Sequence, residues 1–412
     1  MDPIELGRRL RIAREARGLS QQAAADAIGV PRTAITQMES GNRAVSTLEL
    51  TKLAELYRRP VTYFFEEAAP AEEEDVLVAL HRVAPGLEQD PAVRDQVDRC
   101  LSLCRDGVVL ETVLGLAARS GPPAYEMRAP RTAGEAIAQG EHVAHEERRR
   151  LSIGNSPIPD VSELIGAQGI WASGLELPNH MSGLFMRHPS IGLAIIVNAS
   201  HPRGRKRFSY AHEYAHALMD RDHDITISST DNSAELVEKR ANAFAASFLM
   251  PRDGVYEVLR SLDKGLPSRQ EQTIFDAASG GQIEAEARSA PGSQRITYKD
   301  VAIVGHHFGV SYQAALYRLK SLRHVSQPES VELLEHEDFG RQYLNALNMF
   351  KDVGEQEQRQ YWDRELRSEI AHLAIEAYRR EEISRGRLLE LSKSLDIPGE
   401  TLLELAEVAR GE

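Results

Sequence analysis

The decisive stretch of this 412-residue chain reads Phe208-Ser-Tyr-Ala-His-Glu-Tyr-Ala-His-Ala-Leu-Met219. It contains the pattern His-Glu-x-x-His, formed by His212, Glu213 and His216. On a helix, His212 and His216 leave the same face one turn apart, because they are separated by four residues. Two neutral imidazoles at that separation can share one zinc ion, and Glu213 beside them can take a proton from water at the metal. The stretch therefore predicts a metal site with an adjacent base.

The flanking residues place this motif on a core helix that follows a strand. The run from Ile191 to Asn198 is apolar and rich in β-branched residues, which is typical of a buried strand. The residues Ala217 to Met219 continue the motif helix on its apolar side. A zinc hydrolase would carry its motif in such a position.

A zinc site needs a third protein ligand, and the next predicted helix, Ala234 to Met250, offers one. Glu238 adjoins the apolar stripe of that helix, where a half-buried carboxylate would be costly without a cation. Glu235 lies one turn earlier on nearly the same face and is a competing ligand. The residues alone also leave open three candidates that are closer in sequence: Asp222, His223 and Asp224.

Two segments together resemble the ImmA/IrrE family of metallopeptidases. They are Arg207-Phe-Ser-Tyr-Ala-His-Glu-Tyr-Ala-His216 and Glu238-Lys-Arg-Ala-Asn-Ala-Phe-Ala-Ala-Ser-Phe-Leu-Met-Pro251. The resemblance covers roughly residues 130 to 260. It implies Zn2+ held by His212, His216 and Glu238, with Glu213 as the catalytic base of peptide hydrolysis. It departs from the family pattern at Tyr214, where smaller residues are commoner, and at Arg240, where a second acid is common.

Two further roles follow less directly. Asn242 matches a family position, and we interpret it as supporting the ligands or the helix packing, not as a ligand. Peptide hydrolysis also needs a group that stabilises the oxyanion. The sequence does not choose among five candidates: Tyr210, Tyr214, His180, His188 and His223.

The N-terminal residues predict a helix-turn-helix. A first helix precedes Gly18, Ser20 is placed to cap a second helix that ends at Gly29, and a third helix spans Arg32 to Glu39. The segment resembles the Cro/phage-repressor (XRE) class of DNA-binding domains through Gly-Leu-Ser-Gln-x-x-x-Ala and Gly-Val-x-Arg-x-x-Ile-x-x-Met-Glu-x-Gly. That resemblance covers about sixty residues and implies DNA as a partner, with a homodimer on a two-fold site.

Charge supports this assignment. Residues 1–65 carry a net charge of +3 against −13 for the whole chain, so the remainder carries −16. A locally basic domain on an acidic protein indicates a phosphate-binding surface. By docking geometry, we expect base-edge contacts from the recognition helix and phosphate contacts beside it. The base-edge candidates are Arg32, Thr33, Thr36 and Gln37, and the phosphate candidates are Gln21, Asn42 and Arg43.

The remaining segments suggest helices and linkers. An acidic, proline-containing linker spans Glu66 to Asp75, and residues 76–125 predict three amphipathic helices: Val76 to Val83, Val93 to Cys104 and Gly107 to Ala118. Residues 203–207 read as a basic turn, and 279–294 as a flexible loop. Cys100 and Cys104 are expected to be core thiols. Two cysteines, no apolar signal sequence and no transmembrane run indicate a cytoplasmic protein without a membrane partner.

We therefore predict a multidomain, mainly α protein. Its parts are a helix-turn-helix domain (1–66), an acidic linker and helical connector (67–128), an α+β zincin-like peptidase core with a small sheet (129–262), a loop with a helical extension (263–330) and a helical C-terminal region (331–412). The expected function is a regulatory zinc metalloprotease. The resemblance implies that its substrate is a transcriptional repressor or antitoxin, cleaved in a stress or mobile-element response. The alternative is a DNA-binding repressor or antitoxin whose peptidase-like domain senses a ligand or partner.

Overall fold

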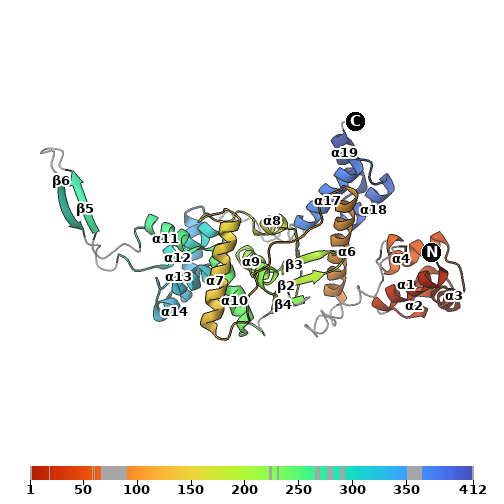
Figure 1. The fold of residues 1–412 in the computed structure, drawn as a ribbon, viewed down its shortest axis with the longest axis horizontal. Coiled ribbons are helices and arrows are strands. Elements are labelled where there is room, and N and C mark those ends of the chain that lie inside the picture. The colour runs from red at the N-terminus through yellow and green to blue at the C-terminus, as the bar shows by residue number, and fades with distance from the viewer. Residues whose placement is uncertain are drawn as a thin grey trace. The chain divides into compact units, whose positions relative to one another are not determined.

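The structure is a computed structural model, and it is mainly helical (Figure 1). It describes residues 2–17, 19–57, 59, 61–65, 91–221, 225–229, 232–264, 270–275, 282–287, 293–349 and 364–410. The chain forms two compact units, Met1–Asp90 and Pro91–Glu412. The predicted linker at Glu66 to Asp75, the predicted helix at Val76 to Val83 and the triplet Asp222, His223 and Asp224 lie outside the described residues. The division into five domains stays a prediction.

The first unit is a small helical domain, and it confirms the predicted helix-turn-helix. Its elements are α1 (Pro3–Ala16), α2 (Gln21–Ile28), α3 (Arg32–Glu39), α4 (Thr47–Tyr57) and the 3-10 helix η1 (Val61–Phe64). The Ser20 hydroxyl caps α2 by accepting a hydrogen bond from the Ala23 amide at 3.1 Å. Gly29 ends α2 with a φ of 75°, a conformation that glycine adopts without strain.

This unit has its own apolar core and a buried polar network. Leu10, Ile35 and Met38 are almost fully buried between the helices. Arg14 of α1 donates to both oxygens of Glu39 on α3, at 2.5 and 3.1 Å. Because both side chains are nearly buried, this pair fixes α3 against α1.

The second unit is built around a four-stranded mixed sheet. Its strands are β1 (Ile170–Leu175), β2 (Met181–His188), β3 (Gly192–Asn198) and β4 (Ile225–Ser229). The order is β1-β3-β2-β4, with β1 parallel to β3 and the other two pairs antiparallel. The apolar run predicted as a buried strand is β3, and every residue from Leu193 to Asn198 is buried. The two edge strands of the sheet are β1, which helices contact, and β4.

Helices pack in the same apolar core as this sheet, and one of them carries the motif. They are α7 (Ala133–Arg150), α8 (Val161–Gly166), α9 (Arg203–Met219), α10 (Leu236–Leu249) and α11 (Arg252–Ser261). The motif helix α9 packs on β2 and β3 and against α10. The helix α10 lies closely along α7, where a Cβ added at Gly140 would stand 2.3 Å from the Arg240 carbonyl oxygen. Aromatic rings of Tyr214, Phe244 and Phe248 fill the space between α9 and α10.

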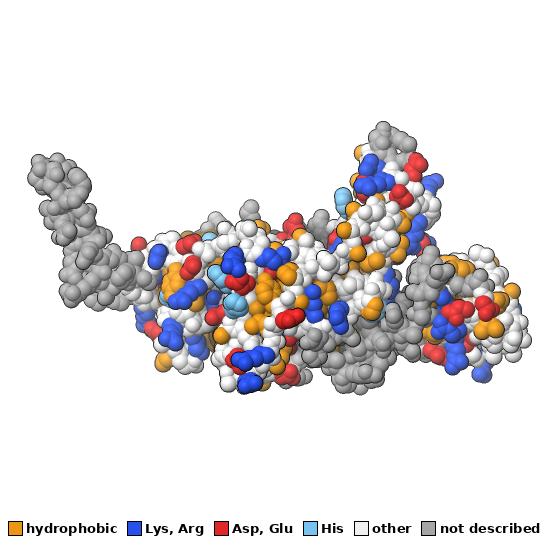
Figure 2. All heavy atoms as spheres, in the orientation of Figure 1, with side chains coloured by type: hydrophobic (Ala, Val, Ile, Leu, Met, Phe, Trp, Pro, Cys, Tyr) orange, Lys and Arg blue, Asp and Glu red, His pale blue; other side chains and the backbone are white. Residues whose placement is uncertain are grey.

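Further helices and a hairpin follow α11. They are β5 (Gln270–Phe275), β6 (Gln282–Ala287), α12 (Tyr298–Phe308), α13 (Tyr312–Ser321), α14 (Gln327–Glu335) and α15 (Glu337–Ala346). The helices α12 and α13 are joined by the turn Gly309-Val-Ser311, in which Gly309 has a φ of 67°. On the face that Figure 2 presents, basic and acidic side chains are intermingled over the described part of this unit. That distribution gives no single-sign patch there.

The C-terminal helices return to the sheet. The helices α17 (Arg364–Arg379), α18 (Arg385–Leu395) and α19 (Gly399–Arg410) pack together, and α17 contacts both β1 and the long helix α6 (Pro91–Val113). The helices α18 and α19 are joined by a short turn at Asp396-Ile-Pro398. Cys100 and Cys104 are buried on α6, as expected.

Three local expectations were wrong. Residues 203–207 form the first turns of α9 and not a basic turn, because Pro202 occupies the N-cap and basic side chains are tolerated on the exposed side. The two helices expected at Val93 to Cys104 and Gly107 to Ala118 overlap one continuous helix, α6, in which Gly107 permits contact with Trp171. The loop expected at 279–294 contains the strand β6, which pairs with β5.

Candidate metal centre and helix-turn-helix surface

Three predicted ligands converge between α9 and α10. His212 Nε2 lies 3.0 Å from Glu238 Oε2 and 3.2 Å from His216 Nε2. His216 Nε2 lies 3.6 Å from the other oxygen of Glu238. All three donor atoms lie within 4.8 Å of one another, and all three residues are buried. The structure therefore brings His212, His216 and Glu238 together, as the sequence predicted.

The hydrogen bonds behind the imidazoles leave the converging nitrogens free to bind a cation. His212 Nδ1 lies 3.0 Å from Asn242 Oδ1, and His216 Nδ1 lies 2.9 Å from Asp220 Oδ2. An oxygen acceptor at Nδ1 favours the tautomer that carries its proton there, so each Nε2 presents a lone pair. Two lone pairs and a carboxylate repel at these separations unless a cation lies among them. The donor set thus fits a metal ion with two nitrogen ligands and one oxygen ligand.

Of the competing ligands, Glu235 lies in the described part of the chain, and it does not join this cluster. Glu235 is exposed and occupies the N-cap of α10. Glu238 is only 4% exposed, so its carboxylate is fully buried and not half-buried as the sequence suggested. A cation among the three donor atoms would offset the cost of burying it.

Glu213 lies beneath the sheet beside these ligands. Its side chain is buried, and neither carboxylate oxygen has a hydrogen-bond partner among the described residues. Gly183 of β2 makes room for it, since a Cβ there would stand 2.8 Å from Glu213 Oε1. Burial raises the pKa of Glu213, and the neighbouring imidazoles oppose that rise. An unpaired buried carboxylate is costly, which is typical of a group kept for chemistry.

The candidates for the group that stabilises the oxyanion lie in different places relative to the candidate ligands. Tyr210 and Tyr214 are each two residues from His212, so they leave the opposite side of α9. The Tyr214 hydroxyl donates to Glu147 of α7 instead. His188 lies five residues along β2 from Gly183, which is about 17 Å in a strand. His180 is exposed directly before β2, and His223 lies outside the described residues.

Sequence reasoning missed the residues that hold the ligands from behind. Arg240 donates to Asp220 Oδ1, while Asp220 Oδ2 faces His216. The Arg240 side chain is 3% exposed and also donates to Gln139 of α7 at 3.3 Å. The departure from the family pattern at Arg240 therefore supplies a cation for Asp220. The available signal was that Asp220 follows His216 by four residues and so lies on the same helix face.

In the first unit, α3 presents the predicted contact residues. Arg32, Thr33, Thr36 and Gln37 are all exposed, while Ala34, Ile35 and Met38 on its other face are buried.

The three predicted phosphate contacts are held within the domain. Gln21 donates to Glu39 at 2.9 Å and accepts from Thr36 at 3.1 Å. Arg43 pairs with Glu49 at 2.7 Å, and Asn42 donates to Ser40 at 3.0 Å. The roles of all seven residues in DNA binding stay predictions.

Comparison with known families matches both units. Residues 166–277 match the model of the M78 peptidases, described as the IrrE N-terminal-like domain, and residues 10–64 match a helix-turn-helix model. The chain joins a helix-turn-helix domain to an IrrE N-terminal-like domain. Both resemblances expected from the sequence are confirmed, and His212, His216 and Glu238 lie inside the first of these matches.

Two curated relatives match the N-terminal unit. They are uncharacterized HTH-type transcriptional regulators from Sinorhizobium medicae (strain WSM419) and Rhizobium meliloti (strain 1021). Each is 31% identical over 65 residues, which is 16% of this chain and 47% of the relative. The chain thus spans about half the length of these relatives.

One solved structure aligns along the chain: Bacillus thuringiensis PlcR in complex with the peptide PapR7 and DNA. It covers 99% of this chain and 98% of that chain at 12% identity, with a TM-score of 0.18. A score of that size supports no structural inference.

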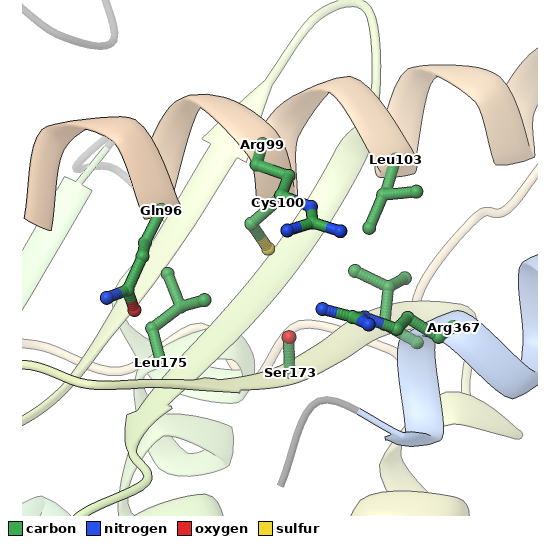
Figure 3. Close-up of a pocket in the computed structure, with 8 residues that line it drawn as sticks. Gln96, Arg99, Cys100, Leu103, Ser173, Leu175 and Arg367 are labelled. Atoms are coloured by element: carbon green, nitrogen blue, oxygen red, sulfur yellow. The ribbon is translucent and has the colours of Figure 1, made fainter. Parts of the chain in front are cut away.

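A small cavity lies between α6, β1 and α17 (Figure 3). It is a cavity of about 60 Å³ lined by Arg99, Arg367, Cys100 and Ser173 among others. Arg99 donates to the Ser394 carbonyl at 3.1 Å, and Arg367 donates to the Leu395 carbonyl at 3.2 Å. These arginines cap the C-terminal end of α18, so they serve the packing of the C-terminal helices. Separately, no helix in the described part of the chain is both long and apolar enough to cross a membrane.

Proposed function

We propose that this chain is a DNA-binding regulatory protein with a zinc-dependent endopeptidase domain. The observation that carries the proposal is the convergence of His212, His216 and Glu238 beside the unpaired carboxylate of Glu213. Two imidazoles, one carboxylate and a neighbouring glutamate form the ligand and base set of a zinc hydrolase. Zinc held by these three residues would supply Lewis-acid polarisation of a peptide carbonyl and a more acidic water.

The chain's own residues perform the remaining steps. Glu213 would accept a proton from the attacking water at a carboxylate oxygen and deliver it to the leaving amine nitrogen. Asn242 and Asp220 contact the Nδ1 atoms of the two imidazoles, so each ring is oriented with its Nε2 toward Glu238. Arg240 donates a hydrogen bond to Asp220 and so holds its carboxylate in place. The buried surroundings exclude bulk water and strengthen each of these interactions.

The N-terminal unit supports the DNA-binding part of the proposal. It has a helix-turn-helix fold, a net charge of +3 and a recognition helix whose outer face carries Arg32, Thr33, Thr36 and Gln37. Its relatives are described as HTH-type transcriptional regulators. We infer that this unit binds DNA as a homodimer in the cytoplasm and so brings the rest of the chain to DNA. The substrate class we propose is a transcriptional repressor or antitoxin, cleaved in a stress response.

The test compares cells that express wild type with cells that express Glu213→Gln, which preserves shape and removes the base. New protein N-termini are mapped by mass spectrometry. We expect termini that appear only with wild type and that fall in a DNA-binding regulator. Equal sets of termini, with equal output of a transcriptional reporter, would contradict proteolysis and favour a sensor role for this domain.

A further inference from the structure

The cavity between α6, β1 and α17 holds a thiol beside two guanidinium groups and a hydroxyl. Cys100 of α6 is 3% exposed, and its sulfur points toward the cavity (Figure 3). The Ser173 hydroxyl points into the cavity from β1, and the side chains of Arg99 and Arg367 line it from α6 and α17. Among the described residues that line the cavity there is no acidic side chain. The thiol therefore faces a positively charged wall.

The cavity has the size of a molecule with two oxygen atoms. Its volume is about 60 Å³, whereas one water takes up about 30 Å³ of liquid. The Arg99 side chain is 45% exposed, so solvent reaches this side of the cavity. The Ser173 hydroxyl is 2% exposed, and its hydrogen bond to the Gly174 carbonyl is long at 3.4 Å. It can therefore turn toward a guest molecule.

The two cysteines of the chain, Cys100 and Cys104, lie one turn apart on α6. Cys104 is 1% exposed and does not line the cavity. Burial raises the pKa of the Cys104 thiol, and a hydrogen bond with Cys100 raises it further. An arginine beside a cysteine favours the thiolate, which is the form that reacts with oxidants. The arrangement therefore places a thiol that reacts first at the cavity and a second thiol directly behind it.

We propose that Cys100 is an oxidation site for hydrogen peroxide and that Cys104 is its resolving thiol. The Cys100 sulfur, as thiolate, attacks one peroxide oxygen, and the O–O bond breaks. The sulfur becomes a sulfenic acid, and the departing hydroxide takes up the proton that the thiol released and leaves as water. Arg99 and Arg367 stabilise the negative charge on the departing oxygen. The Cys104 sulfur then displaces the sulfenic hydroxyl, which leaves as water with the Cys104 proton, and a disulfide forms.

This disulfide alters the contact between α6 and α17. Cβ atoms one turn apart on a helix are separated by about 5–6 Å, whereas a disulfide needs about 3.5–4.5 Å. The helix must therefore distort between Cys100 and Cys104. The neighbouring turn is closely packed, because a Cβ added at Gly107 would stand 2.5 Å from Ile370 Cδ1 of α17. Oxidation therefore loosens the C-terminal helices from α6, whether or not the metal centre is a peptidase.

The experiment treats the full chain with hydrogen peroxide and stops the reaction in urea that contains dimedone and a thiol-alkylating reagent. Dimedone traps sulfenic acids after unfolding, and peptide mass spectrometry without reduction locates the products. We expect a disulfide between Cys100 and Cys104 in wild type, a dimedone adduct at Cys100 in Cys104→Ser and no adduct at Cys104 in Cys100→Ser. The adduct at Cys100 should form about tenfold faster in the folded chain than in a chain unfolded before peroxide is added.

Two variants and a second oxidant test the cavity itself. In the Cys104→Ser background, Arg99→Gln should slow the reaction at Cys100 about fivefold, because it removes a guanidinium group from the cavity. The matched control is Arg105→Gln, which changes an arginine of α6 that does not line the cavity and should leave the rate unchanged. tert-Butyl hydroperoxide is too large for the cavity and should react no faster with the folded chain than with the unfolded one.

The movement of the C-terminal helices has its own readout. Amide hydrogen exchange in α17 should accelerate after peroxide treatment of wild type and not of Cys104→Ser. Circular dichroism checks the helix content of each variant, and Cys100→Ala replaces a serine variant that does not fold. Equal rates for folded and unfolded chain, equal rates for Arg99→Gln and Arg105→Gln, or an adduct at Cys104 in Cys100→Ser would overturn the oxidation site. Unchanged exchange in α17 after the disulfide has formed would overturn the loosening.

Discussion

Asp220 and His216 lie one turn apart on α9, with Asp220 Oδ2 2.9 Å from His216 Nδ1. Arg240 of α10 donates to the other oxygen of the same carboxylate. Asp220 and Arg240 therefore fix the orientation of the His216 ring, although neither of them is among the three candidate metal ligands.

Removing the Asp220 carboxylate should weaken metal binding. Asp220→Ala frees the His216 ring to rotate and to change tautomer, and we expect a loss of about 10-fold to 100-fold in zinc affinity. Competition against a chromophoric chelator measures it. Glu235→Gln is the control, since Glu235 is exposed on the neighbouring helix. Equal affinities for Asp220→Ala and wild type would show that Asp220 does not orient His216.

Removing the Arg240 guanidinium should destabilise the fold. Arg240→Met leaves the buried Asp220 carboxylate without its arginine partner, which costs about 3 kcal/mol in the free energy of unfolding. Urea unfolding followed by tryptophan fluorescence reports it, because Trp171 is buried in the same unit. Arg252→Ala, at an exposed arginine, should leave the midpoint unchanged. A wild-type midpoint for Arg240→Met would mean that Asp220 needs no partner.

The close contact of α7 and α10 predicts a steric effect. A Cβ at Gly140 would stand 2.3 Å from the Arg240 carbonyl oxygen and 2.8 Å from the Phe244 nitrogen. Gly140→Ala should push the helices apart and cost about 2 kcal/mol of stability. Gly134→Ala, in the first turn of the same helix and with open space around it, should be neutral or stabilise by up to about 1 kcal/mol. Thermal unfolding of the two variants compares them, and equal melting temperatures would refute the close packing.

The exposed face of α3 predicts that a substitution there weakens DNA binding without disturbing the fold of the domain. Arg32→Ala should weaken binding to a fragment selected from random DNA by about tenfold, without a change in helix content. Arg11→Ala is the control, because Arg11 is an exposed α1 residue that pairs with Glu15 at 2.9 Å. Anisotropy titrations must share one salt concentration. Equal losses from both variants would indicate general charge attraction in place of recognition by α3.

Much of this molecule could be predicted from short-range patterns. The spacing of His212 and His216 and the caps at Ser20 and Gly29 depend on helix geometry alone, so the sequence revealed them. The residue pattern left Glu238 as one of several candidate ligands, and the family resemblance chose it before α9 and α10 were placed together. Asp220 and Arg240 could not be assigned, because their roles arise from contacts between elements that the sequence pattern does not align.

The central claim is that His212, His216 and Glu238 hold one metal ion. Native mass spectrometry of the intact chain, after equilibration with zinc and removal of the excess, tests it most directly. We predict one zinc per chain for wild type and for Glu213→Gln, and none for His216→Ala or Glu238→Gln. A wild-type chain without zinc, or full zinc occupancy in Glu238→Gln and His216→Ala, would contradict the account.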